Sequence, residues 1–420
     1  MSLVVGIVSA ALGVQGASYT TYTWQAVDGS YNGSFANSAH WTPAQTGYPG
    51  QSDGAIVNAN QLAVFPRVEN AEVRVTFPDG EVDNISSFQS RIGTGQSTWF
   101  IGTNTIWNMP ALTDGVSKRK NFSFYADGGS SDTARHFITY ESEDAVDRGY
   151  FNNFLVCHSS TESGTRLDVY EGELNFTPSD GMMMLFDDTV GGDIHGLAEL
   201  CMHEGTSLSL PMGAYIGSSS KTNRLTFAGG THTLGNMRTQ FNVGNSDGFS
   251  EIDIAVTNGA VVYMDNLTLG YYNVANRKFS NEKVHRVTVA NGASLTFKTF
   301  SFNNPGLLAM HVSGAGSTVK ATSNFGAGNY SNSVVRIAVV DGATLDLSYA
   351  PYFGAQSAAS SVGNDVQIGL TNATLKLAGN QSFTMYSGKL SLVDTDVSIG
   401  GTQGAICGGG VAGLSPECGM

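Results

Sequence analysis

The chain is poor in charge, poor in cysteine and almost free of long hydrophobic runs. Only 13% of its 420 residues are charged, and the net charge is −14 at pH 7. The basic runs extend no further than Lys118-Arg119-Lys120, so we expect no binding to nucleic acid or to anionic membranes. After the first residues, no segment approaches transmembrane length. The sequence therefore predicts no membrane span in the mature chain.

Cysteine is represented by four residues, none of them in a Cys-x-x-Cys pair. A thiolate metal centre is therefore not expected, and the sequence predicts no metal site and no cofactor. Cys407 and Cys418 lie in a Gly-rich tail, where a short loop allows a disulfide between them. Cys157 and Cys201 can meet only if the chain folds back, and they are also explained as small buried apolar residues.

Small turn-forming residues are what the chain has in abundance. It contains 52 glycines and many Ser, Thr and Asn residues, while 41% of its residues are hydrophobic. Such a composition disfavours helices and general disorder, because β-branched and turn residues are common and a core can be built. The length allows either several domains or one elongated repetitive body, and the composition favours the second.

The N-terminus has the pattern of an export signal. An apolar stretch over residues 3–14 is followed by the small residues Gly16, Ala17 and Ser18, which is typical of a signal peptide and its cleavage site. Only Met1 and Ser2 precede the stretch, so the basic region usual in such peptides is missing and the start can be internal to a longer reading frame. A buried first strand is the alternative.

An internal repeat is centred on glycine. Ile254 and Val256 precede Gly259, and Val262 and Met264 follow it at matching distances. The same arrangement, or its downstream half, surrounds the other turn positions: Gly172, Gly205, Gly292, Gly342, Asn372 and Asp394. Asn and Asp tolerate a positive φ better than other residues with side chains. The repeat therefore predicts an unusual, left-handed backbone at each turn.

The period of the repeat, about 22 to 33 residues, leaves room for a third strand besides the two that flank the turn. An apolar residue followed by glycine, as in Ile216-Gly217 and Leu269-Gly270, marks this third strand. Three short strands per period predict an all-β fold, a right-handed single-stranded parallel β-helix or β-solenoid, rather than a meander of hairpins. Outward Ser, Thr and Asn would then form neutral ladders, where repeated like charges would repel.

Four parts follow from this pattern. Residues 1–17 are expected to be the signal peptide, 18–66 a Trp/Gly/Pro-rich capping segment, 67–400 the β-helix repeats and 401–420 a Gly-rich tail. A solenoid needs covered ends. Either the tail covers the C-terminal end, or the polypeptide is the front part of a longer protein.

The capping segment resembles a known family. Thr23-Trp24, the run Asn37-Ser38-Ala39-His40-Trp41 and the run Tyr48-Pro49-Gly50-Gln51-Ser52-Asp53-Gly54-Ala55 are similar to the opening motif of secreted bacterial proteins with autotransporter-type β-strand repeats. His40 replaces the Asn that precedes Trp in that motif. The resemblance covers about the first 60 residues by motif and the rest by repeat style. It implies an exported β-helix, displayed as a passenger or adhesin at a bacterial surface.

Catalysis has one candidate cluster. Asp187, Asp188, Asp193 and His195 lie close together in sequence, and paired carboxylates on a solenoid can cleave glycosidic bonds. The cluster is similar to the Asp-Asp and Gly-His-Gly motifs of polygalacturonases, but the Asn-Thr-Asp and Arg-x-Lys motifs of that family are absent. A solvated loop or an incidental Ca²⁺ contact also explains this cluster, and equally explains His203-Glu204 and residues 141–147. No catalytic residue is assigned.

Three functions remain at this stage. The leading expectation is a secreted or surface-displayed solenoid with a structural or adhesive role, whose partners are polysaccharides or host and cell-surface glycans. A polysaccharide lyase or glycoside hydrolase on the same scaffold is the alternative. A non-catalytic carbohydrate-binding fibre is the third, and the signal-like N-terminus disfavours it.

Overall fold

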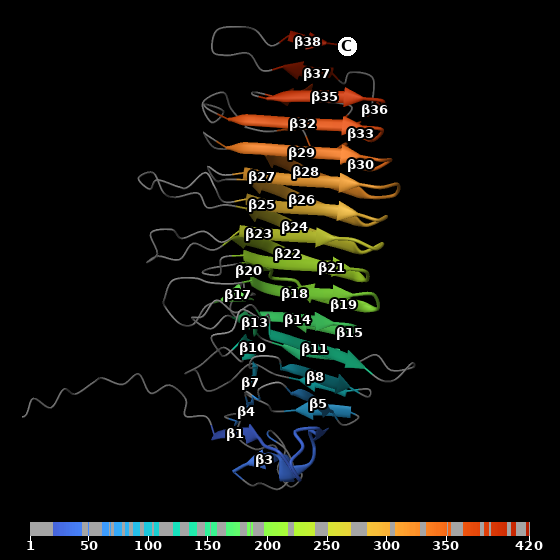
Figure 1. Ribbon diagram of the computed structural model, residues 1–420. Helices are drawn as coiled ribbons and strands as arrows, with labels where there is room; N and C mark the ends of the chain where they lie inside the picture. Colours follow the sequence, from blue (N-terminus) through green and yellow to red (C-terminus); the bar gives the residue numbers. More distant parts are fainter. Residues whose placement is uncertain are drawn as a thin grey trace, which may run out of the picture.

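A computed structural model gives the fold (Figure 1). It describes residues 20–43, 49, 61–66, 68, 71–77, 80–83, 87–92, 96–102, 105–108, 121–126, 134–140, 148–151, 153–157, 165–176, 183–184, 186–187, 197–216, 222–239, 251–269, 284–302, 307–327, 333–350, 352–353, 364–378, 382–385, 388–400, 405–408 and 417–419.

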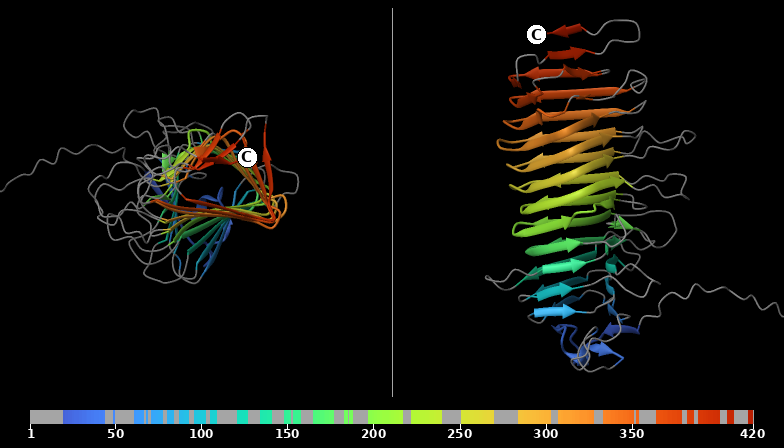
Figure 2. Two further views of the ribbon diagram at one scale, coloured as in Figure 1. Left: turned by 90° about the horizontal axis from the view of Figure 1, so that it is seen from above. Right: turned by 180° about the vertical axis from the view of Figure 1, so that it is seen from behind.

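Stacked coils form one column, seen from the side in Figure 1 and along its axis in Figure 2. A 13-stranded parallel sheet, here called the long sheet, runs along one side of the column. Its strands are β2 (Gly33–Ser34), β5 (Glu72–Thr76), β8 (Ser97–Gly102), β11 (Ala134–Tyr140), β14 (Thr165–Val169), β18 (Leu197–His203), β21 (Thr222–Ala228), β23 (Glu251–Val256), β25 (Val284–Ala290), β27 (Leu307–Ser313), β29 (Val334–Val340), β32 (Asp365–Thr371) and β35 (Lys389–Val393).

A second side follows the strands of the long sheet from β5 onward. Its strands are β6 (Gly80–Asp83), β9 (Thr105–Asn108), β12 (Arg148–Phe151), β15 (Gly172–Phe176), β19 (Thr206–Leu210), β22 (Thr231–Thr239), β24 (Val261–Leu269), β26 (Ser294–Phe302), β28 (Thr318–Ala327), β30 (Thr344–Leu347), β33 (Thr374–Leu377) and β36 (Asp396–Ile399).

The third side changes along the column. In the first coils it is a seven-stranded sheet of β3 (Trp41–Thr42), β1 (Thr20–Trp24), β4 (Gln61–Phe65), β7 (Ser87–Ile92), β10 (Asn121–Ala126), β13 (Asn153–Cys157) and β17 (Phe186–Asp187). Later it contains β16 (Met183–Met184), β20 (Ala214–Ile216), β31 (Tyr352–Phe353), β34 (Ser382–Met385), β37 (Ala405–Gly408) and β38 (Glu417–Gly419).

In the middle coils the second and third sides merge into single bent strands. β22 pairs with β19 through Ser209↔Thr233 and with β20 through Ala214↔Met237, so one strand crosses a corner of the column. The strands are parallel and in register over most of the stack, as between β24 and β26. The predicted parallel β-helix with about three strands per coil is therefore confirmed.

Turns with left-handed backbone join the long sheet to the second side. Every turn position of the repeat has a positive φ: Gly172, Gly205, Gly259, Gly292, Gly342, Asn372 and Asp394. Asn258 and Gly259 both have a positive φ, of 55° and 73° respectively. Two successive positive φ values are those of the tight turn that joins hairpin strands. Here the same turn directs the chain around a corner, because β23 and β24 pair with neighbouring coils on different sides.

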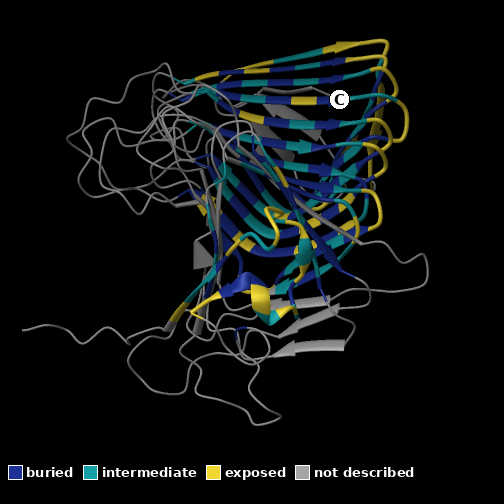
Figure 3. Ribbon diagram, turned by 60° about the horizontal axis from the view of Figure 1, so that its bottom comes forward, coloured by how far each residue is buried: buried dark blue, intermediate teal, exposed yellow. Residues whose placement is uncertain are grey.

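Inward side chains form apolar columns that run from coil to coil. In the long sheet, Leu200, Leu225, Ile254 and Val287 are register partners in four successive coils, and all are buried. Buried and less buried residues alternate along the strands, and exposed residues gather at the turns (Figure 3). Since each coil buries its apolar residues against its neighbours, stability comes from stacking.

His232 is an exception inside this core. It is fully buried, its Nδ1 accepts a hydrogen bond from the Leu208 N–H at 3.1 Å, and its Nε2 lies 2.8 Å from the carbonyl oxygen of Gly229. Burial lowers the pKa of His232 to about 4, against the opposing effect of the Gly229 carbonyl. The ring is therefore neutral at pH 7 and donates from Nε2.

Aromatic rings close the N-terminal end of the column. The His40 ring, in the short 3₁₀ helix η1 (Ser38–His40), stacks on Trp24 with centroids 4.2 Å apart. A Cβ at Gly33 would lie 2.2 Å from His40 Nε2, so only glycine leaves room for this ring. Trp41 donates a hydrogen bond from Nε1 to the carbonyl oxygen of Phe35 at 2.9 Å. Four aromatic side chains of this cluster are fully buried: Trp24, Phe35, Trp41 and Phe65.

At the other end, the last full coil is less covered. Leu392, Val397 and Ile399 are register partners or neighbours of buried inward residues, yet each is exposed. Residues 1–17, the predicted signal peptide, lie outside the described residues. Within the described part of the chain, no helix has the length and apolar character needed to cross a bilayer.

Candidate functional site

Of the predicted acidic cluster, Asp187 alone lies within the described residues. Asp187 ends β17, where its backbone pairs with Cys157 of β13, but Asp188, Asp193 and His195 lie outside the described residues. The charged segment at 141–147 also lies outside them. Convergence of these carboxylates therefore stays a prediction. Cys407 of β37 lies directly opposite Cys418 of β38, so the backbone register agrees with the predicted disulfide, which also remains a prediction.

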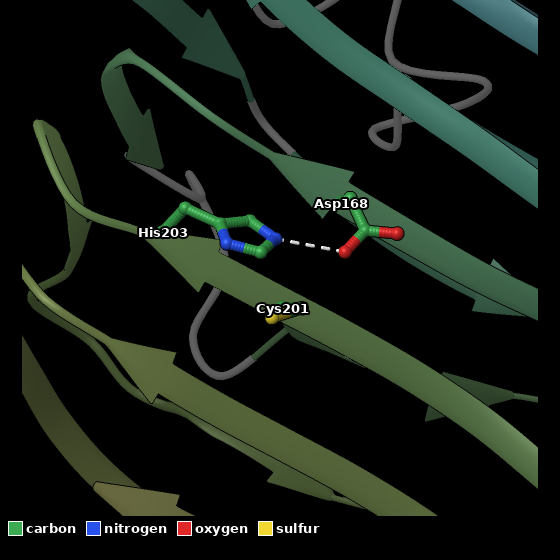
Figure 4. Close-up of side chains that lie close together, drawn as sticks. All are labelled: Asp168, Cys201 and His203. Atoms are coloured by element: carbon green, nitrogen blue, oxygen red, sulfur yellow. Dashed lines mark hydrogen bonds and ion pairs between the residues drawn. The ribbon is translucent and has the colours of Figure 1, made fainter. Parts of the chain in front are cut away.

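A different polar cluster lies on the outer face of the long sheet. Asp168 of β14 is the register partner of Cys201 in β18, and His203 follows two residues later on the same face. Asp168 and Cys201 are buried although they point away from the apolar core, and His203 is partly exposed. Figure 4 shows the three side chains converging between the two strands. We call Asp168, Cys201 and His203 the outer-face cluster.

Asp168 is the centre of the hydrogen bonding. Arg166 donates from Nε to Oδ2 at 2.8 Å and from Nη2 to Oδ1 at 2.7 Å, a bidentate ion pair. Nε2 of His203 lies 2.8 Å from the same Oδ1. Burial alone would raise the pKa of Asp168, but the hydrogen bonds from His203 and Arg166 outweigh it and lower the pKa to about 2. The carboxylate is therefore ionised at all physiological pH values.

Cys201 remains a thiol in this environment. Burial raises its pKa to about 12, and the charge of Asp168 adds to the rise. A cysteine that acts as a nucleophile needs a lowered pKa, because the thiolate is the reactive form. The arrangement of Cys, His and Asp is therefore unsuited to thiol catalysis as it stands.

A stack of rings holds His203 in place. Its imidazole lies on Tyr170 with centroids 4.2 Å apart, and Tyr170 lies 6.3 Å from Trp99 in a near-parallel orientation. The guanidinium of Arg74 is 5.6 Å from the Trp99 ring. His203 lies against one face of Tyr170 at stacking distance, so that face is covered and cannot stack on a sugar. This ladder therefore supports the cluster rather than forming a glycan platform.

Charges of alternating sign continue from the cluster across five coils. Arg166, Glu199, Arg224, Asp253 and Arg286 are successive register partners, and we call them the charge ladder. Nη1 of Arg166 lies 3.2 Å from Oε2 of Glu199. Nε of Arg224 lies 3.0 Å from Oδ2 of Asp253. The sequence predicted neutral outward ladders, because like charges would repel. Alternation of sign removes that repulsion, so charged rungs also fit the stack.

Sequence reasoning missed the outer-face cluster. The sequence alone predicts a solvated loop position for His203, next to a turn, and a small buried apolar residue for Cys201. The signal was present: aligning the turns at Gly172 and Gly205 places Asp168 opposite Cys201 and Tyr170 opposite His203. Contacts in and around the cluster therefore join residues 33 to 35 positions apart in sequence. Examples are the hydrogen bonds of Arg166 with Glu199 and of Asp168 with His203.

Comparison with models of protein families, with curated proteins and with solved structures finds no match to this chain. Its function must therefore be argued from its own residues.

Proposed function

We propose that the protein is an exported β-solenoid, secreted or displayed at a bacterial cell surface, with a structural or adhesive role. The observation that carries the proposal is the long sheet: 13 parallel strands present one continuous outer face, on which charged residues of adjacent coils bond to each other. Such a face is extended and internally satisfied, which suits a spacer or an adhesive surface. The signal-like N-terminus and the resemblance of the capping segment support export.

The described acidic residues give catalysis less support. A general acid in glycoside cleavage needs a raised pKa. Asp168 and Asp365 instead have lowered pKa values: His203 and Arg166 hydrogen-bond to Asp168, and Arg336 hydrogen-bonds to Asp365. Glu199 and Asp253 each form an ion pair with an arginine of the adjacent coil. Hydrolysis or lysis of polysaccharide therefore remains the alternative, and it would depend on Asp187 and its neighbours.

Export and display are tested on intact cells that express the full chain. We expect added protease to remove the chain from intact cells, or the culture medium to contain it, while a cytoplasmic control protein stays inside. Retention of the whole chain with the cytoplasmic control would overturn the proposal of export.

Adhesion is tested by passing the purified protein over immobilised polysaccharides and measuring both retention and product release. We expect retention on at least one glycan without release of soluble product. Release that is lost in Asp187→Ala or Asp188→Ala would overturn the adhesive role in favour of an enzyme. Neither retention nor release would leave the structural role as the proposal.

A further inference from the structure

We propose that the outer-face cluster, Asp168, Cys201 and His203, binds a divalent transition metal ion of the zinc type. The inference does not depend on the proposed function. It differs from the prediction made from sequence, where the absence of a Cys-x-x-Cys pair indicates no metal site. In a solenoid, ligands come from adjacent coils instead of from one loop.

The geometry of the donors carries the inference. One ligand atom each from the carboxylate, the thiol and the imidazole lie within 4.8 Å of one another. Ligand atoms of a tetrahedral zinc site, with bonds of about 2.0 to 2.3 Å, are separated by roughly 3.3 to 3.8 Å. Small side-chain rotations can therefore bring the three donors to one ion. The backbone already fixes their spacing, since Asp168 and Cys201 are register partners in paired strands.

The surroundings orient the donors as the outer shell of a metal site does. Arg166 holds the Asp168 carboxylate through two hydrogen bonds, and Tyr170 holds the His203 ring by stacking. A carboxylate has about four lone-pair positions, of which Arg166 uses two. The position on Oδ1 that now faces His203 Nε2 becomes available once that nitrogen binds a metal instead.

Charge balance also favours a divalent ion. Arg166 contributes one positive charge, and Asp168 and Glu199 contribute two negative charges beside it. Binding would convert the Cys201 thiol to a thiolate, which adds a third negative charge. The resulting excess of two negative charges is the charge that a divalent cation neutralises. The guanidinium of Arg166 is thus balanced by Glu199 and need not repel the ion.

Metal binding releases the proton of the Cys201 thiol. The sulfur–hydrogen bond of Cys201 breaks, its proton goes to solvent, and a sulfur–metal bond forms. His203 binds through Nε2, so the hydrogen of the neutral ring resides on Nδ1. No oxidation or reduction occurs. His203 is partly exposed, so solvent can supply a fourth ligand. Sulfur and nitrogen donors select zinc-like ions over Ca²⁺ and Mg²⁺, which prefer oxygen.

The test uses the purified full chain, stripped with a chelator and titrated with Co²⁺ as a spectroscopic probe. We expect one Co²⁺ per chain, with a sulfur-to-cobalt charge-transfer band, and displacement of Co²⁺ by an equal amount of Zn²⁺. Cys201→Ser should abolish the band, and His203→Gln should weaken binding at least tenfold. The matched control is the double variant Cys407→Ser/Cys418→Ser, which should keep the band and the affinity.

X-ray absorption of the wild-type zinc complex keeps the proposal testable if a variant fails to fold. We expect one sulfur neighbour at about 2.3 Å and nitrogen or oxygen neighbours at about 2.0 to 2.1 Å. No bound metal after titration, a band that survives Cys201→Ser, or a zinc environment without sulfur would each overturn the proposal.

Discussion

Tyr170 and His203 stack ring on ring across two adjacent coils, with centroids 4.2 Å apart and planes 13° from parallel. Neither residue is close to the other in sequence, so the contact exists only because the coils stack in register. Nε2 of His203 lies 2.8 Å from Oδ1 of Asp168, and Arg166 donates hydrogen bonds to both oxygens of the same carboxylate. The buried carboxylate of Asp168 therefore links β14 to β18.

Removing the charge of Asp168 should destabilise the fold. Asp168→Asn leaves the Arg166 guanidinium without its bidentate partner, and we expect a loss of about 3 kcal/mol in the free energy of unfolding. Asp253→Asn is the matched control, because its ion pair with Arg224 is more exposed; it should cost about 1 kcal/mol or less. Denaturant unfolding at pH 7 measures both. Equal costs would mean that Asp168 is no more important than an ordinary surface ion pair.

Asp168 also predicts an acid limit. Its pKa is about 2 in the folded protein, below the ordinary value of 3.8, so its contribution is complete above about pH 4 and lost as the pH falls towards 2. The expected loss is about 2 kcal/mol. Asp168→Asn should lack this part of the pH dependence, and an unchanged acid profile in the variant would contradict the assignment.

His232 should govern stability at a higher pH. Its pKa of about 4 lies below the ordinary 6.5, so between these values the unfolded chain binds a proton that the folded protein does not. Stability should therefore fall by about 3 kcal/mol from pH 7 to pH 4. His232→Gln should flatten this slope in denaturant titrations at several pH values. The exposed His311 is the control, and His311→Gln should leave the slope as it is.

Two turn glycines with the same backbone should respond differently to alanine. Gly230 and Gly259 have φ of 75° and 73°, but a Cβ at Gly230 would lie 2.0 Å from the carbonyl oxygen of Thr206, whereas nothing lies within 4 Å at Gly259. Gly259→Ala should cost about 1 to 2 kcal/mol from backbone strain alone. Gly230→Ala should cost about 3 to 5 kcal/mol, because the clash is added. Denaturant midpoints compare them, and similar costs would show that the clash is relieved.

The tail cysteines should be oxidised in exported protein. Cys407 and Cys418 are opposite each other in the antiparallel pair β37 and β38. We expect a peptide pair that is joined under non-reducing conditions and separated by reduction, with a loss of about 2 to 3 kcal/mol on reduction. Cys201 is the internal control: it is buried, so it should react with alkylating reagents only after denaturation. Free alkylation of Cys407 and Cys418 in unreduced, denatured protein would exclude the disulfide.

The solenoid could be predicted from sequence because its rules are local. The apolar positions around Gly259 and Gly292 recur at fixed distances from the turn, and that recurrence specifies both the inward columns and the corner. The outer-face cluster could not be found in the same way. Asp168 points outward yet is buried beside Arg166 and His203, and burial of an outward residue has no periodic signature. Catalytic motifs are recognised by residues that are neighbours in sequence, whereas stacking brings together residues one coil apart.

Parallel stacking in register has a further consequence for how such a molecule can change over time. Each coil of the long sheet makes its hydrogen bonds with the coil before and the coil after it, and β25 pairs with β23 and β27 alone. A whole coil can therefore be gained or lost while the strands of the remaining coils keep the same kind of pairing. Each such change alters the distance between the two ends of the column by about 4.8 Å. Length is thus the most freely adjustable property of this architecture, and the distance it spans can be selected one coil at a time.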